Sequence, residues 1–202
     1  MSSQANALAP QQRVAALGAL LAQRQERYSS SGIWVGVFAI TMSFAAFTSA
    51  LFVRQGTPDW GHLALPPILY LNTVLLLASS GTLEMARHAR NETEGTRKAS
   101  GWVLLTLLLG LAFCVGQYLA WLDLRAQGVY LATNPNSSFF YLLTFLHVLH
   151  VGAGILVLVY LAGRLVASHT TFRRSLFENT AVYWHFMGVL WVYLLLLCSM
   201  KL

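Results

Sequence analysis

Apolar residues along this chain gather into five long runs rather than into short alternating stretches. Each run holds about 20 residues, the length that an α-helix needs to cross the hydrocarbon core of a bilayer. Strands of a membrane barrel would instead show alternation over about ten residues. The pattern therefore predicts an all-α polytopic membrane protein, with five transmembrane helices in a bundle over residues 33–53, 67–88, 102–122, 138–166 and 178–200.

The chain before the first run has a different pattern, with one apolar patch flanked by arginines. One face of a helix here carries Val14, Leu17, Leu20 and Leu21, and its other face carries glutamine and arginine. A short signal-peptide core is the alternative interpretation, but the pattern favours a retained amphipathic helix that lies on the membrane. We expect residues 1–30 to form a cytoplasmic or interfacial arm and residues 31–202 to form the transmembrane domain.

Composition supports the same fold class. The 202 residues are 56% hydrophobic and only 10% charged, whereas about a quarter of the residues in a soluble domain are charged. The net charge of +6 does not indicate a nucleic-acid-binding protein, because the thirteen lysines and arginines sit almost entirely in the loops. We therefore expect no nucleic-acid partner. The distribution of the basic residues instead indicates how the chain is oriented in the membrane.

The basic residues are divided unequally between the two ends of the predicted helices. Ten lie in the N-terminal arm and in the second and fourth loops, namely Arg13, Arg24, Arg27, Arg87, Arg90, Arg97, Lys98, Arg164, Arg173 and Arg174. Three lie at the other end, namely Arg54, Arg125 and Lys201. Because lysine and arginine concentrate on the cytoplasmic side of membrane proteins, we expect the N-terminus in the cytoplasm and the C-terminus outside.

The second and third predicted helices carry polar residues within apolar surroundings. Glu84 precedes Arg87 by three residues and His88 by four, so the three side chains share one face near the helix end. They fit an interfacial ion pair, or a contact with a partner or a lipid headgroup. The third helix contains one amide, Gln117, which we expect to bridge to another helix.

The last two predicted helices hold most of the candidate chemistry. His147 and His150 are three residues apart on the fourth helix, so they share a face. Glu178 and His185, with Trp184 beside it, are seven apart and also share a face on the fifth helix. Because the two helices run in opposite directions, His147 and His185 are expected at similar depth, which allows a buried polar seam between the helices.

Spacing alone leaves three interpretations of this seam open. Haem or metal ligation needs imidazoles that converge on one centre from facing helices, and two histidines three apart on one helix fit stacked haems poorly. A proton relay needs titratable groups that reach both membrane surfaces. The third interpretation, which the spacing favours, is structural: hydrogen-bonded histidines fasten the helices or present a face to a larger partner.

Two segments of these helices combine aromatic residues, histidine and glutamate at a characteristic spacing. The segment GVYLATNPNSSFFYLLTFLHVLHVGAG carries Ser138, Phe139, Phe140, His147, His150 and Gly152. The segment FENTAVYWHFMGVLW carries Glu178, Tyr183, Trp184, His185, Phe186 and Trp191. Together with Gln117 and the segment ASSGTLEMARHA, they resemble subunit III of the haem-copper terminal oxidases, in the short five-helix bacterial form.

The resemblance implies a non-catalytic subunit in a bacterial plasma membrane. Members of the family bind no haem or copper themselves, pack against the catalytic subunit I and other oxidase subunits, bind phospholipid, and support proton uptake. Their complex reduces O₂ to water with electrons from cytochrome c or quinol and pumps protons. The expected structural or interface residues are Glu84, Gln117, His147, His150, Glu178, Trp184 and His185, and no catalytic or metal-ligating residue is expected in this chain.

Two other functions stay open beside this expectation. One is the related accessory subunit of nitric oxide reductases, and the other is a free-standing membrane cytochrome or transporter that uses its histidines directly. The chain also departs from the family pattern. Thr41, Met42 and Ser43 occupy the stretch where members commonly have a glutamate, and Gly188 stands where they commonly have an aspartate.

Overall fold

The computed structural model describes residues 10–56, 60, 65–89, 95–166 and 174–201. Within these residues it contains no strand, and the helices are α2 (Pro10–Arg54), α3 (Ile68–Ala89), α4 (Gly95–Ala126), α5 (Pro135–Val166) and α6 (Arg174–Lys201). All five are long and apolar enough to cross a membrane, in the spans Ser31–Arg54, Ile68–Ala89, Arg97–Ala126, Pro135–Val166 and Ser175–Lys201. The predicted all-α fold with five membrane helices is confirmed.

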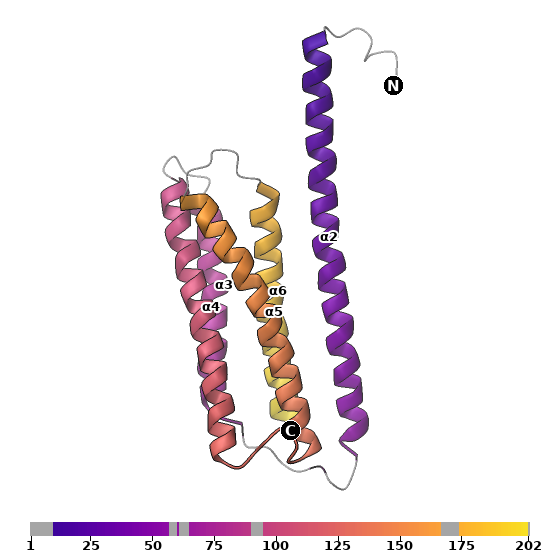
Figure 1. Cartoon of the computed structure of the whole chain (residues 1–202), viewed down its shortest axis with the longest axis vertical. Helices are drawn as coiled ribbons and strands as arrows, with labels where there is room; N and C mark the ends of the chain where they lie inside the picture. The colour runs from indigo at the N-terminus through magenta and orange to yellow at the C-terminus, as the bar shows by residue number, and fades with distance from the viewer. Residues whose placement is uncertain (1–9, 57–59, 61–64, 90–94, 167–173, 202) are drawn as a thin grey trace.

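The helices α3 to α6 form an antiparallel bundle, and α2 stands at its side (Figure 1). Apolar residues from all five helices make one core, in which Phe44, Phe113, Phe140, Trp184 and Trp191 are among the largest fully buried side chains. The outer faces of the helices are also apolar. A bundle with an apolar core and an apolar exterior suits a hydrocarbon solvent, in which only backbone groups bonded within the protein are tolerated.

The helix α2 is continuous from Pro10 to Arg54. Residues 10–30 extend the axis of the membrane span beyond the end of the bundle (Figure 1), and the expectation that they lie on the membrane stays a prediction. The connecting SSSG segment at residues 29–32 contains no proline, and the helix runs through it. Val14 and Leu17 on this extension are exposed. The functional division of the chain at residue 30 stays a prediction.

The helix α4 extends further than its apolar run at both ends. It begins at Gly95 in the polar loop, because a helix can continue into water after it leaves the lipid. It ends in a Schellman motif, in which Gly128 adopts φ +79° and its N–H donates to the carbonyl of Arg125 at 3.0 Å. The N–H of Val129 donates to the carbonyl of Leu124 at 2.9 Å. This turn sets the path from α4 into α5.

Candidate functional site

Five charged or imidazole side chains, here called the charged cluster, lie where α3 ends and α6 begins: Glu84, Arg87, His88, Glu178 and His185. Arg87 contacts Glu84 at 3.5 Å and Glu178 at 2.5 Å. Glu84 also lies 3.3 Å from His88 Nε2 and 3.5 Å from His185 Nε2. Glu84, Arg87 and His88 therefore meet on one face of α3 as predicted, and the cluster joins α3 to α6.

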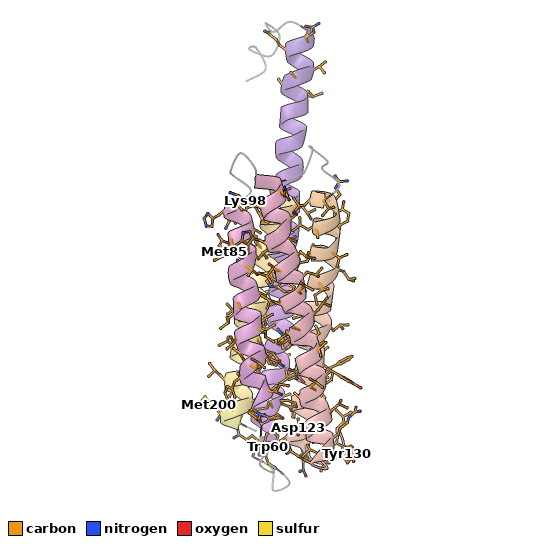
Figure 2. The ribbon with its side chains drawn as sticks, turned by 90° about the vertical axis from the view of Figure 1, so that its left-hand side faces the viewer. Trp60, Met85, Lys98, Asp123, Tyr130 and Met200 are labelled. Carbon is orange, nitrogen blue, oxygen red and sulfur yellow. The ribbon has the colours of Figure 1, made fainter. Side chains whose placement is uncertain are left out.

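The charged cluster lies at the end of the bundle marked by Met85 and Lys98 in Figure 2. The side chains that join the two helices, Glu84, Arg87, Glu178 and His185, are each between 31% and 45% exposed. Ion pairs with this exposure are screened by solvent and contribute about 0–1 kcal/mol each. We infer that the cluster sets the position of α3 relative to α6 more than it adds stability.

The expected seam between the last two helices is not a single feature. Glu178 and His185 contact Arg87 and Glu84 of α3. The ring of His147 instead lies 5.1 Å from that of Trp191, six residues beyond His185, which is about 9 Å further along the axis of α6. His147 therefore meets α6 at Trp191 rather than at His185, and their expected similar depth in the membrane stays a prediction. Sequence spacing shows which residues share a face of a helix, but α5 crosses its neighbours obliquely (Figure 1), and the tilt decides which residues meet.

His147 is fully buried between two aromatic rings. The ring of Phe113 on α4 meets it edge-on at 5.8 Å, and the ring of Trp191 on α6 lies at 5.1 Å with an interplanar angle of 32°. Within the part of the chain that the structure describes, neither ring nitrogen of His147 has a hydrogen-bond partner. Ring contacts of His147 join α5 to α4 and α6 here, and the role expected for its hydrogen bonds stays a prediction.

His150 lies where three helices meet. Its Nδ1 is 2.6 Å from the carbonyl of Leu146 on its own helix. The hydroxyl of Tyr183 on α6 donates to the backbone carbonyl of His150 at 2.9 Å. The ring of Phe44 on α2 meets the imidazole edge-on at 5.9 Å. His150 therefore helps to position α2 and α6 against α5.

Polar residues of α3 form several side-chain hydrogen bonds to other helices. The indole of Trp184 donates to Ser79 Oγ at 2.9 Å, and the indole of Trp191 donates to Thr73 Oγ1 at 3.0 Å. Asn72 Nδ2 donates to Gln117 Oε1 at 3.4 Å, so Gln117 does bridge to another helix. The sequence analysis assigned no role to Asn72 or Ser79. Their spacing of seven residues places them on one face of an apolar helix, which could have indicated that both contact a neighbouring helix.

Two glycines make room for the buried indole of Trp184. An ideal Cβ at Gly110 of α4 would lie 2.8 Å from Cη2 of this ring, and one at Gly154 of α5 would lie 3.1 Å from Cε3 and Cζ3. A Cβ at Gly152 would have no neighbour within 4 Å. Small residues at helix interfaces allow the helices of membrane proteins to approach each other closely. Here Gly110 of α4 and Gly154 of α5 leave space for the Trp184 side chain of α6.

The described residues contain no group of three or more His, Cys, Asp or Glu side chains arranged to hold a metal ion. Of the two free cysteines, Cys198 is buried and Cys114 is half-buried. The polar side chains considered above contact residues of neighbouring helices through ion pairs, indole donors, amides and rings. Their arrangement can fasten the five helices in a defined order.

Comparison with known proteins gives a consistent result. The family model described as "Cytochrome c oxidase subunit III" matches residues 28–200. The probable cytochrome c oxidase subunit 3 of Mycobacterium leprae is 32% identical over 175 residues, which cover 81% of this chain and 83% of the relative. Cytochrome c oxidase subunit 3 of Synechocystis sp. is 31% identical over 173 residues, with 84% of this chain and 70% of the relative covered. Cytochrome c oxidase subunit 3 of Corynebacterium diphtheriae is 31% identical over 196 residues, with 92% and 91% covered.

Proposed function

Because this chain belongs to the cytochrome c oxidase subunit III family, we propose that it is the non-catalytic subunit III of a bacterial respiratory haem-copper oxidase. In this proposal it stabilises the catalytic subunit I, contacts other oxidase subunits and supports proton uptake. Haem and copper belong to the partner subunits, where O₂ is reduced to water. The observation that carries the proposal is the family match over residues 28–200, which runs through all five membrane helices.

The placement of the three histidines supports a structural subunit over a cytochrome. His185 contacts Glu84 on α3, His150 contacts the carbonyl of Leu146 on its own helix, and His147 lies between two aromatic rings. Haem ligation by histidines requires imidazoles placed to reach one iron. These three side chains have different neighbours, and each helps to hold the helices in place. A rigid bundle of this kind suits a subunit that presents a fixed surface to a partner.

We propose that the chain lies in the bacterial plasma membrane with its N-terminus in the cytoplasm and its C-terminus outside. Ten of the thirteen lysines and arginines belong to the N-terminal arm and to loops at one end of the bundle, which supports this orientation. An odd number of spans places the two termini on opposite sides. A phosphatase reporter fused after Leu202 is expected to be active outside the cell, and activity of a cytoplasmic reporter there would contradict the orientation.

Purification of the tagged chain tests the proposed complex. In mild detergent, we expect oxidase subunit I to co-purify with it, together with haem absorbance that belongs to the partner. Recovery of the chain alone or with nitric oxide reductase subunits would contradict the proposal. A haem band carried by the isolated chain and lost in the His147→Ala variant would do so as well.

The charged cluster offers a sharper test of the supporting role. His185→Leu removes the contact between α6 and Glu84 and is expected to reduce the fraction of the chain that co-purifies with the oxidase, with little change in the haem spectrum. His88→Leu is the matched control, because His88 contacts the same carboxylate from within α3 and does not join two helices. Equal losses in both variants, or altered haem-copper spectra in an intact complex, would contradict the role assigned to His185.

A further inference from the structure

Three polar side chains lie fully buried inside the bundle and come from three different helices: Asn72 on α3, Gln117 on α4 and His147 on α5. They are here called the buried polar site. All three belong to the membrane spans of their helices. A polar group in an apolar interior is costly unless it is hydrogen-bonded, so each polar atom of this site needs a partner.

Each of these side chains has polar atoms that are not bonded to any of the described residues. Asn72 Nδ2 donates to Gln117 Oε1 at 3.4 Å, which leaves Asn72 Oδ1, Gln117 Nε2 and both ring nitrogens of His147. An ideal Cβ at Gly116 of α4 would overlap Asn72 Oδ1, so this oxygen packs against α4 beside Gln117. The site therefore offers an acceptor on α3, a donor on α4 and, because a neutral imidazole has one donor and one acceptor, a nitrogen of either kind on α5.

Two contacts between α4 and α5 place His147 beside Gln117. The indole N–H of Trp121 donates to Thr144 Oγ1 at 3.1 Å, and the ring of Phe113 lies 5.8 Å from that of His147. Phe113, Gln117 and Trp121 follow one another at intervals of four residues, so they share one face of α4. Thr144 and His147 are three apart and share one face of α5. Gln117 thus lies between the two contacts and opposite the same face of α5.

Contacts of Trp191 on α6 place Asn72 in the same layer of the bundle. The indole N–H of Trp191 donates to Thr73 Oγ1 on α3 at 3.0 Å. The same indole ring lies 5.1 Å from the ring of His147 on α5. Thr73 is the neighbour of Asn72 in the chain, and Asn72 is bonded to Gln117. The unbonded groups of α3, α4 and α5 are therefore close together.

Water matches these groups better than other small ligands do. A metal cation such as Ca²⁺ or Mg²⁺ takes several oxygen ligands, whereas the three side chains offer one unbonded oxygen. A direct hydrogen bond from Gln117 to His147 would leave Asn72 Oδ1 unbonded. A buried water typically makes about three hydrogen bonds to polar groups that otherwise have no partner. The site offers three such partners, one on each helix.

We propose that the buried polar site binds one water molecule, which links α3, α4 and α5 within the membrane span. The water accepts a hydrogen bond from Gln117 Nε2, donates one to Asn72 Oδ1, and bonds to one nitrogen of His147. In this arrangement His147 fastens the helices through the water, in addition to its ring contacts with Phe113 and Trp191. The inference needs only the bundle of this chain and does not depend on which complex the chain joins.

Radiolytic footprinting tests for the bound water. An X-ray pulse converts water into hydroxyl radicals, and a radical formed at a bound water oxidises the side chains beside it, even where bulk solvent does not reach. The tagged chain is purified with whatever subunits accompany it, irradiated and digested, and oxidation is measured by mass spectrometry of its peptides. Phe113 and Phe140 are both fully buried, but only Phe113 contacts the imidazole of His147. Phe113 is expected to be oxidised faster than Phe140.

Variants connect this oxidation to the polar groups. Gln117→Leu removes the amide of α4 and should lower the oxidation of Phe113 to the level of Phe140. The matched control is Thr106→Val, because Thr106 Oγ1 lies 2.8 Å from Thr82 Oγ1 and also joins α4 to α3, outside the buried polar site. Thr106→Val should retain the oxidation of Phe113.

A second variant keeps the test decisive if Gln117→Leu does not fold. His147→Phe retains an aromatic ring between Phe113 and Trp191 but has no nitrogen, so it should also lower the oxidation of Phe113. Equal oxidation of Phe113 and Phe140 in the wild type would overturn the proposal. Unchanged oxidation of Phe113 in either Gln117→Leu or His147→Phe, or an equal loss in Thr106→Val, would overturn it as well.

The same preparation distinguishes this inference from the proposed function. The subunits that co-purify with the tagged chain are identified before irradiation. If no oxidase subunit is among them, the proposed function fails, but the oxidation of Phe113 relative to Phe140 is still measured. If oxidase subunits are present and the two residues are oxidised equally, the proposed function stands and the bound water is wrong.

Discussion

Gly110→Ala should destabilise the bundle, because the ring of Trp184 occupies the space that a Cβ would need. An ideal Cβ at Gly110 lies 2.8 Å from Cη2 and 3.0 Å from Cζ2 of that ring. Trp184 is fully buried, and its indole N–H donates to Ser79 Oγ at 2.9 Å. The indole therefore cannot move away from α4 without straining this hydrogen bond or its other neighbours.

The expected magnitude follows from two opposing terms. Overpacking a filled core costs about 1–3 kcal/mol, and alanine regains up to about 1 kcal/mol over glycine through helix propensity. With the full propensity gain subtracted, we expect a net loss of up to about 2 kcal/mol for Gly110→Ala. Gly154→Ala should cost less, because its Cβ would lie 3.1 Å from the nearest ring atoms. Gly152→Ala should be neutral or slightly stabilising, since nothing lies within 4 Å of its Cβ.

Thermal stability in mild detergent measures the effect, as the temperature at which half of the tagged protein leaves its monodisperse chromatographic peak. For a chain of this size, 1 kcal/mol corresponds to roughly 2–4 °C, so the melting temperature of Gly110→Ala is expected to be lower than that of the wild type by up to roughly 8 °C. Trp184→Phe removes the ring atoms that the new Cβ would meet. Gly110→Ala should thus cost less in the Trp184→Phe background than in the wild type.

Two outcomes would refute this reasoning. Equal stability of Gly110→Ala and Gly152→Ala would show that the indole yields without cost. Additive losses in the double variant Gly110→Ala/Trp184→Phe would show that the two residues do not interact in the way that their geometry indicates.

Three further changes are measured by the same melting experiment. Glu178→Gln, which removes the charge opposite Arg87, should cost no more than about 1 kcal/mol because both side chains are part-exposed; a loss that persists unchanged in about 1 M salt would contradict an ionic origin. Gln117→Leu deprives Asn72 of its hydrogen-bond partner and should lower stability by about 0.6–1.7 kcal/mol. The double variant Asn72→Leu/Gln117→Leu should regain part of this loss, because no buried amide is then left unpaired. No recovery in the double variant would argue against the pairing. Gly128→Val places a β-branched residue at φ +79° and should cost about 1–2 kcal/mol, more than Gly128→Asn; equal effects would contradict strain at this turn.

Several features could be predicted from the sequence because each is a property of one continuous segment. A run of about 20 apolar residues specifies a membrane helix by its length and composition, and all five were found in this way. The spacing of Glu84, Arg87 and His88 is local to one helix, so their meeting on one face was also predictable. The motifs around His147 and His185 indicated the family that the comparisons show.

Hydrophobic patterning was less informative about where helices end. It locates the part of a helix that lies in lipid, whereas backbone hydrogen bonds continue into water as long as no residue breaks them. For this reason α2 begins at Pro10 and α4 begins at Gly95, both well before their apolar runs. The extension of α2 along its own axis is a consequence of that continuity (Figure 1).

The sequence by itself determined five membrane helices, their order and the residues that share a face on each. Only the tertiary structure decided which faces meet: it placed His185 and Glu178 against α3, His147 between Phe113 and Trp191, and Trp184 beside Gly110 and Gly154. The physical reason is that periodicity within a helix depends on its local geometry alone. The neighbour of each face depends on the rotation, tilt and depth of separate helices, which are set by packing among residues far apart in the chain.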